Sequence, residues 1–372
     1  MSALTPFERV ALLAIALLTA LAGVADYGAW TPVLSFALAT LALAGLAWIV
    51  SFATGHLGDR FGPGVTGMLQ STLGNLPELF VVIFALQKGE LVVAQTAIVG
   101  SVLANALLVL GLVIVVGARR SHDGVMRFSK RLPRDTATLL QVTVFIIVLL
   151  GLSLGSHDPA SHHVKAISIV GAICLLGVYM TWVVPYLRAD TAPGEPHDDP
   201  SASDGEGGGD AAPKRAPRRR ELSLALILAL LLLGGGASAF VSDWFVAALQ
   251  PSIDTLHISQ AFAGLVIVAI AGNAVENAAG LVLAWKGRSD LAISVVKNSV
   301  AQIAAFLFPA LVLISLALLS TLTFSLAPVY IGALVLTVLA LAQITGDGEA
   351  VEFEGWSLVA LYAILATFTL YE

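Results

Sequence analysis

Long apolar runs alternate with short polar connections along most of this chain, and each run has about the length that crosses a bilayer as a helix. The runs are too long and too evenly apolar to be the alternating strands of a membrane barrel. We therefore expect an all-α polytopic membrane protein with about eleven transmembrane helices. The expected spans cover residues 8–24, 32–54, 66–87, 92–117, 135–154, 164–188, 222–246, 258–285, 290–318, 325–344 and 355–371.

One segment, residues 190–220, interrupts this pattern. It is rich in glycine, proline and acidic residues, and it ends in a run of basic residues. Because such a composition cannot bury a core, we expect a disordered cytoplasmic linker. A calcium-sensing role is an alternative, although the segment lacks the alternating acidic ligands of an EF-hand loop.

The linker divides the expected spans into one extra N-terminal helix and two sets of five. These units cover residues 1–30, 31–189 and 221–372. Since five is an odd number, the second set enters the membrane with the opposite polarity to the first. The sequence therefore predicts two inverted-topology five-helix repeats, an arrangement that is common in secondary transporters.

Composition agrees with a membrane protein, because 58% of the residues are hydrophobic and only 12% are charged. A soluble protein usually carries about 25% charged residues. Cys174 is the only cysteine, which excludes intrachain disulfides and thiolate metal clusters. We expect no cofactor and no nucleic-acid partner. We interpret the apolar segment 11–25 as a retained helix rather than a signal peptide.

Lysine and arginine gather in the connections 118–134 and 188–221, whereas the connections 155–163 and 247–257 contain neither. Positively charged loops of membrane proteins face the cytoplasm. We therefore expect the N-terminus and the linker in the cytoplasm and the C-terminus outside, in the cell membrane. The acidic connection around residues 347–354 should then be a solvated cytoplasmic loop.

Two related five-residue motifs each place a carboxylate inside an expected span. The first motif, Gly74–Glu78, reads Gly-Asn-Leu-Pro-Glu, and the second, Gly272–Glu276, reads Gly-Asn-Ala-Val-Glu. An ionisable group at membrane depth costs at least ~2.5–3.5 kcal/mol and is usually functional. A buried structural acid is the alternative for a single glutamate. Two glutamates in matching motifs, each in the second span of its set, predict a cation site instead.

The residues around the two glutamates supply further oxygen ligands. Each motif has an asparagine three residues before the glutamate and therefore on the same helix face. Pro77 has no N–H, so a carbonyl four residues earlier loses its helical partner and becomes free to bind an ion. The expected supporting ligands in and beside the motifs are Asn75, Asn273, Leu73, Gly74 and Gly272. Calcium takes 6–8 oxygen ligands, which suits this set, whereas softer metals favour histidine or cysteine.

The span that follows each motif adds polar residues. Ser101 and Asn105 are four residues apart, and Asn298, Ser299 and Gln302 lie within about one turn. Such residues often serve only helix packing in membranes. Because they follow the glutamate motifs directly, we expect them to be supporting ligands.

Lys297 is an unusual residue for the ninth span. One interpretation is a side chain that reaches up to the cytoplasmic surface. The other is an internal cation that modulates the site by pairing with Glu276 when no calcium is bound.

The two motifs resemble the paired alpha-repeat motifs of the calcium/cation antiporter superfamily. The stretches Gly100–Gly111 and Leu291–Pro309 are similar to the calcium/proton exchanger branch of that superfamily. The resemblance implies exchange of Ca²⁺ for H⁺ by alternating access, with Glu78 and Glu276 binding calcium and protons in competition. It also implies that the second and seventh spans slide.

The chain departs from the pattern of this branch at two positions near the site. Asn277 stands where many exchangers carry a histidine, so a proton-relaying histidine is absent from the motif. Asn298 stands where many relatives have a glycine. The linker is also too rich in glycine and proline to form the acidic helix seen in relatives.

Three rival functions remain open at this point. A sodium- or potassium-coupled exchanger of the same superfamily is the nearest rival. A cation channel is a second, although inverted repeats favour alternating access. A membrane-embedded enzyme is the third, but the chain has no His-Glu-x-x-His motif, and Gly346-Asp347 lacks the second glycine of an intramembrane aspartyl protease. We expect that the protein is not an enzyme.

Overall fold

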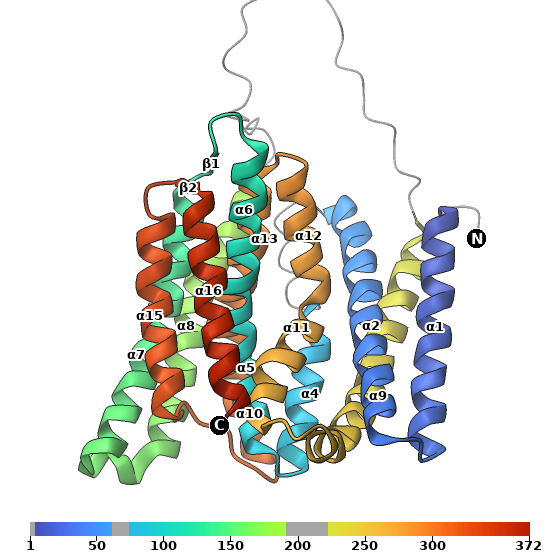
Figure 1. The fold of residues 1–372 in the computed structure, drawn as a ribbon, viewed down its shortest axis with the longest axis horizontal. Helices are drawn as coiled ribbons and strands as arrows, with labels where there is room; N and C mark the ends of the chain where they lie inside the picture. Colours follow the sequence, from blue (N-terminus) through green and yellow to red (C-terminus); the bar gives the residue numbers. More distant parts are fainter. Residues whose placement is uncertain (1–3, 62–73, 191–221) are drawn as a thin grey trace, which may run out of the picture.

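The computed structural model describes residues 4–61, 74–190 and 222–372. These residues form a bundle of helices with one short pair of strands (Figure 1). The first half contains α1 (Pro6–Tyr27), α2 (Pro32–Phe61), α4 (Leu76–Gln87), α5 (Leu91–Leu103), η1 (Ala104–Val109), α6 (Leu110–Arg120), β1 (Val125–Arg127), α7 (Arg131–Ser156), η2 (Pro159–His163) and α8 (Val164–Asp190).

The second half is also built from helices with one short strand. It contains α9 (Leu224–Leu256), α10 (Gln260–Phe262), η4 (Ala263–Val268), α11 (Ala269–Gly272), α12 (Ala274–Trp285), α13 (Ser289–Gln302), η5 (Ile303–Leu307), α14 (Phe308–Ile314), η6 (Ser315–Ala317), α15 (Pro328–Thr345), β2 (Glu349–Val351) and α16 (Glu352–Leu370). The segments η1, η4 and η5 are π-helical turns inside longer helices.

The helical membrane class expected from the apolar runs is confirmed, but the expected number of spans is not. Within the described ranges, nine helices are long and apolar enough to cross a membrane, and the bent chain from α10 to α12 raises the number to ten. The expected span 66–87 is represented by α4 alone, because residues 66–73 lie outside the described part. The expected linker also lies outside it, apart from Asp190 at the end of α8.

The continuous helices α5–α6 and α13–α14 occupy the centre of the bundle. In their most apolar stretches, 89% and 67% of the residues are buried inside the protein, compared with 17% for α1. Helices α1, α2 and α9 lie on one side of this centre, and α7, α8 and α15 lie on the other (Figure 1). The two central helices are therefore the elements on which a site protected from lipid can be built.

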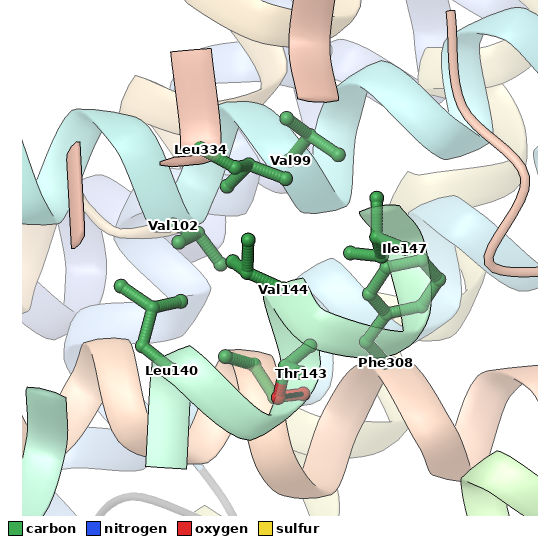
Figure 2. Close-up of a pocket in the computed structure, with 9 residues that line it drawn as sticks. Val99, Val102, Leu140, Thr143, Val144, Ile147, Phe308 and Leu334 are labelled. Carbon is green, nitrogen blue, oxygen red and sulfur yellow. Dashed lines mark hydrogen bonds between the residues drawn. The ribbon is translucent and has the colours of Figure 1, made fainter. Parts of the chain in front are cut away.

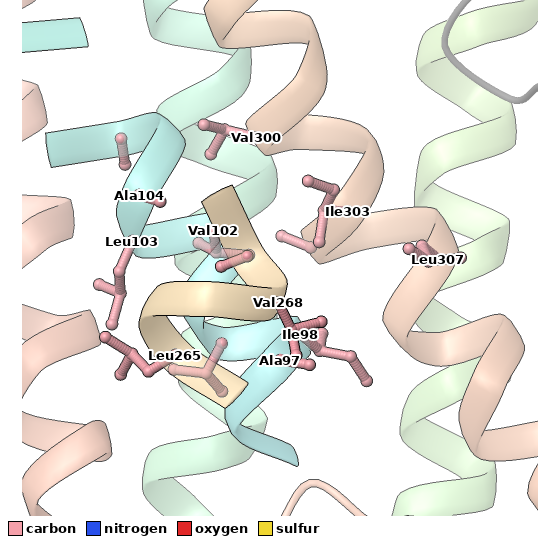
Figure 3. Packing of buried hydrophobic residues seen from close by; sticks show 14 of the residues in the cluster. Ala97, Ile98, Val102, Leu103, Ala104, Leu265, Val268, Val300, Ile303 and Leu307 are labelled. Carbon is pink, nitrogen blue, oxygen red and sulfur yellow. The ribbon is translucent and has the colours of Figure 1, made fainter. Parts of the chain in front are cut away.

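Two glycines allow α5 and η4 to cross closely. A Cβ on Gly100 of α5 would lie 2.5 Å from Cα of Leu265 in η4, and a Cβ on Gly264 would collide with Thr96 of α5. Only glycine fits where two helix backbones approach so closely. Figure 3 shows the apolar cluster around this crossing, with Ile98 and Val102 of α5 beside Val268.

A short antiparallel ribbon joins the two halves at one end of the bundle. Strand β1 pairs with β2, so that Arg127 lies opposite Glu349, and the two side chains form an ion pair of 3.3 Å. Arg119 pairs with Glu352 at 2.5 Å. Both glutamate side chains are exposed, at 55% and 40%, which agrees with the expected solvated loop. Their basic partners were not expected, because local sequence does not reveal partners that lie more than 200 residues away.

A small apolar cavity lies among α5, α7, α14 and α15 (Figure 2). Thr143 is the only polar residue in its lining, and its hydroxyl is already bound to backbone carbonyls. The lining residues are Val99, Val102, Leu140, Thr143, Val144, Ile147, Ala304, Phe308 and Leu334. Since no charged group faces this cavity, it is not a candidate ion site.

Candidate ion-binding site

The second motif lies at a break in the helical chain. Helices α11 and α12 are separated by Asn273 and meet at a bend of 60°. The side-chain amide of Asn273 donates to the carbonyl of Ala269 and to the hydroxyl of Ser101, each at 3.0 Å. The break therefore aims one residue of the second motif at α5, in the other half of the chain.

The first motif lies at the start of α4. Asn75 is the N-cap of this helix and Pro77 lies in its first turn, where a proline is tolerated because that N–H has no helical partner. The hydroxyl of Ser242 in α9 lies 3.5 Å from the Pro77 carbonyl. Leu73, whose carbonyl we expected to be free, lies outside the described residues.

The two motifs face each other. The Oε1 atom of Glu276 lies 3.0 Å from the position that a Cβ on Gly74 would take, and Cβ of Glu78 lies 3.7 Å from the corresponding position on Gly272. Each glutamate therefore packs against the glycine of the opposite motif. Glu78 is 1% exposed, whereas Glu276 is half-buried.

Within the part of the chain that the structure describes, many acceptor oxygens of the site lack a hydrogen-bond donor. Among the described residues, the Glu78 carboxylate has only the Ser101 hydroxyl beside it, and one oxygen of Glu276 and the amide oxygen of Asn273 are buried without a hydrogen-bond donor. The same holds for side-chain oxygens of Asn105, Asn277, Asn298, Ser299 and Gln302. A buried acceptor without a donor costs about 1–3 kcal/mol, and native proteins contain few of them. Those acceptors that lie beside the two carboxylates are the kind of ligand that a dehydrated cation needs.

The structure supports a place beside the glutamates for some of the expected ligands. Ser101 lies beside the Glu78 carboxylate and Ser299 beside the Glu276 carboxylate. The amide of Asn105 donates to the carbonyl of Ser101 at 3.0 Å, which leaves its oxygen free. Each central helix therefore contributes a hydroxyl to the carboxylate of one motif.

Other expected ligands are less closely connected to the glutamates. Gln302 lies beside the hydroxyl of Tyr179 in α8. Among the contacts of the described residues, none joins Asn298 to either glutamate. Helical spacing placed these two residues near Ser299 along the chain, but it did not reveal which neighbouring helix each one faces.

Lys297 agrees with neither interpretation drawn from the sequence. It does not reach the surface, because it is 0% exposed. Among the described residues it forms no ion pair, with Glu276 or any other acid, and its Nζ donates to Thr345 Oγ1 of α15 at 3.2 Å. The side chain of Lys297 thus leaves α13 on a different face from Ser299.

Sequence reasoning missed three hydroxyls near the site. Ser51 of α2 lies 4.0 Å from the position of a Cβ on Gly74, Ser242 of α9 lies by Pro77, and Tyr179 lies by Gln302. Single hydroxyls in apolar helices are too common to stand out in a sequence. For Ser51 and Ser242, the available signal was their position on α2 and α9, the two spans that the resemblance implied to slide.

Irregular turns also mark the site. The π-helical segments η1, η4 and η5 contain Asn105, precede Asn273 and follow Gln302, respectively. Single π-turns inside α-helices leave carbonyls without their usual partners and are frequent at functional sites. The backbone is therefore irregular in three helices that carry candidate site residues.

Comparison with known proteins identifies the family. Residues 31–186 and 226–371 match the family described as sodium/calcium exchanger protein. The chain belongs to this family. The match covers both motifs and both central helices, and it omits α1 and the whole expected linker. Members of this family are transporters, so the expectation that the protein is not an enzyme is confirmed.

Several relatives extend over nearly the whole chain. A Ca²⁺/H⁺ antiporter of Synechocystis is 30% identical over 345 residues, which is 91% of each protein. The Ca²⁺/H⁺ antiporter ChaA of Bacillus subtilis is 27% identical over 337 residues, 91% of this chain and 92% of the relative. This member of the exchanger family is an integral membrane protein.

Solved structures confirm the fold. Native YfkE has a TM-score of 0.77 with 24% identity, and the match covers 97% of this chain and 100% of the YfkE chain. The H⁺/Ca²⁺ exchanger CAX has a TM-score of 0.71 with 15% identity, covering 98% of this chain and 93% of its own. The sodium-calcium exchanger NCX_Mj is more distant, with a TM-score of 0.56.

Proposed function

We propose that this family member exchanges Ca²⁺ for H⁺ by alternating access. The observation that carries the proposal is the meeting of Glu78 and Glu276, each against the glycine of the other motif, among acceptor oxygens that lack donors. The named antiporters that resemble the chain over about nine-tenths of its length support the choice of ions. Relatives named as vacuolar calcium ion transporters and cation/proton exchangers agree with it.

Competition between ions drives the proposed cycle. Two carboxylates in a buried site are costly when charged and uncompensated. One Ca²⁺ neutralises both of them, and so do two protons. The site opens to each side of the membrane in turn. It therefore releases calcium on the side where protons are abundant and binds calcium on the side where they are scarce. Glu78 and Glu276 carry this exchange.

The supporting residues supply neutral ligands in this proposal. Asn273, Asn105, Ser101 and Ser299 contribute oxygens from helices that belong to both halves of the chain. Calcium accepts such mixed oxygen sets in flexible geometry. The amide oxygens of Asn75, Asn298 and Gln302 and the backbone near Leu73, Gly74 and Gly272 complete the candidate set.

The proposed architecture is an extra helix followed by two inverted repeats, residues 31–189 and 221–372. Paired features support it: each half has one glycine at the helix crossing, Gly100 and Gly264, and one glutamate motif at a helix break. In this proposal the protein lies in the cell membrane, and the basic connections support a cytoplasmic location of the N-terminus and of residues 190–220. The C-terminus is then outside.

Calcium uptake into proteoliposomes under an imposed pH gradient tests the function. We expect uptake that depends on the gradient and stops when a protonophore collapses it. Sodium, potassium and manganese ions are added in turn as competitors. Uptake that needs sodium or potassium instead of the pH gradient would favour the sodium- or potassium-coupled alternative, which the family description and the likeness to NCX_Mj keep in view. Calcium uptake that needs neither a pH gradient nor a sodium or potassium gradient would indicate a channel.

A further inference from the structure

The buried cation Lys297 has no role in the exchange described above. Its side chain is fully buried, and its Nζ bonds to the Thr345 hydroxyl, which in turn donates to the carbonyl of Leu341. Lysine is almost never fully buried unless it is paired. Thr345 is the last residue of α15, and the C-terminal end of a helix carries partial negative charge. The end of α15 therefore takes the place of an acidic partner.

Lys297 also lies in a regular seam between α13 and the α7 region. The backbone N–H of Ser129 donates to Asp290 at 2.6 Å, Thr136 Oγ1 donates to the Lys297 carbonyl at 3.3 Å, and Thr143 Oγ1 donates to the Ala304 carbonyl at 3.2 Å. In both chain segments the bonded positions advance by seven residues. Seven residues are about two helical turns, so the three bonds lie along one face of the continuous helix α13–η5.

The opposite face of α13 carries a site residue. Successive residues on a helix are about 100° apart, so Ser299 points about 200° away from Lys297. On the side of Ser299, Val296 packs against Gly280 of α12, the helix that carries Glu276. The rotation of α13 that Lys297 and its seam define is therefore the rotation that presents the Ser299 hydroxyl to the Glu276 carboxylate.

We propose that Lys297 is a positioning residue for the ion site, and that its bond to Thr345 at the end of α15 fixes the rotation of α13 that aims Ser299 at Glu276. The proposal rests on the proposed function only in taking Ca²⁺ as the ion. Lys297 does not touch the ion. It acts from behind the site, in the way that outer partners of metal ligands set ligand orientation and metal affinity.

Three variants test this role. Lys297→Met removes the donor, Thr345→Val removes its acceptor, and Thr337→Val is the matched control. Thr337 is also a buried threonine of α15 that bonds to the carbonyl four residues earlier, but its hydroxyl has no bond to Lys297. The readouts are equilibrium Ca²⁺ binding to purified protein and the calcium concentration for half-maximal uptake in proteoliposomes.

We expect Lys297→Met and Thr345→Val each to weaken calcium binding about tenfold. The half-maximal concentration should rise equally, with an unchanged maximal rate per inserted protein. Because both variants break the same hydrogen bond, the double variant should bind calcium no more weakly than either single variant. The Thr337→Val control should bind calcium like the wild type. A merely structural role would lower the maximal rate or the yield of folded protein instead.

The opposite results would overturn the proposal. Unchanged calcium affinity in Thr345→Val, or additive losses in the double variant, would show that the bond does not set the site. If Lys297→Met fails to fold, Thr345→Val decides, since it keeps the lysine. A wild-type protein that binds Ca²⁺ without exchanging it for protons would remove the proposed exchange but leave this binding test valid. A wild type that binds no Ca²⁺ would overturn both.

Discussion

Glu276 of the second half lies against Gly74 of the first, with its Oε1 atom 3.0 Å from the position of a Cβ on that glycine. A methyl group there would press on the carboxylate that the proposed site needs. We expect Gly74→Ala to weaken calcium affinity about tenfold, because the carboxylate must shift away from its ligand position. Calcium binding to the purified variant measures this change.

Two other glycines serve as controls for this substitution. A Cβ on Gly272 would meet Cβ of Glu78 at an ordinary 3.7 Å, and a Cβ on Gly55 of α2 would meet nothing within 4 Å. We expect a smaller effect for Gly272→Ala and none for Gly55→Ala. Equal losses in all three variants would show that helix propensity, rather than contact with Glu276, is responsible.

The close crossing of α5 and η4 predicts a loss of stability when a methyl group is added there. A Cβ on Gly100 would lie 2.5 Å from the Leu265 backbone, which cannot move as a flexible side chain can. Overpacking of this kind costs about 1–3 kcal/mol. Gly100→Ala should therefore unfold at a lower temperature in detergent than Gly177→Ala, whose added methyl group meets nothing within 4 Å. Equal melting temperatures would contradict the close crossing.

The amide of Asn273 depends on Ser101 for its orientation. Ser101→Ala removes the hydroxyl that accepts from Asn273 Nδ2 and that lies beside Glu78. We expect weaker calcium binding with little change in melting temperature, because one polar contact is lost without a cavity in the core. Ser156→Ala is the control, since that exposed hydroxyl bonds only to its own helix. Calcium affinity equal to that of the wild type would separate Ser101 from the site.

The strand pair β1–β2 should respond to pH. The hydrogen bond from Arg127 holds the pKa of Asp123 below its usual range. The ion pair therefore stabilises the folded ribbon above the pKa of the unfolded chain, about 3.9, and this contribution is lost as pH falls through the lower folded value. Hydrogen exchange of residues 125–127 should be slightly faster in Asp123→Asn than in the wild type at neutral pH. The difference should vanish in acid, and a difference that grows in acid would contradict the assignment.

Much of the fold follows from the apolar pattern alone. The expected spans correspond to helices throughout the described residues, because a membrane helix must satisfy its own backbone and so reveals itself by length. The strand pair β1–β2 could not be predicted from the apolar pattern. Its strands are three residues long, and each is defined by a partner in the other half of the chain.

Site residues that are rare in membrane helices could be predicted from the sequence, whereas residues that are common there could not. Two glutamates in apolar helices stand out, and their motifs do come together in the structure. The direction of Lys297 could not be predicted, since local spacing defines a helix face but not the helix that covers it. Thr345, its partner, is one of many threonines in apolar helices and carries no signal of its own.

Parallel measurement of calcium uptake and proton release for Glu78→Gln and Glu276→Gln tests the central claim most directly. Glutamine keeps the shape of the side chain but can neither bind a proton in exchange nor carry the charge that calcium requires. We predict that each variant inserts and melts like the wild type, while pH-driven calcium uptake and the matching proton release are both lost. Near-normal coupled fluxes in either variant would contradict the claim that these two carboxylates exchange calcium for protons.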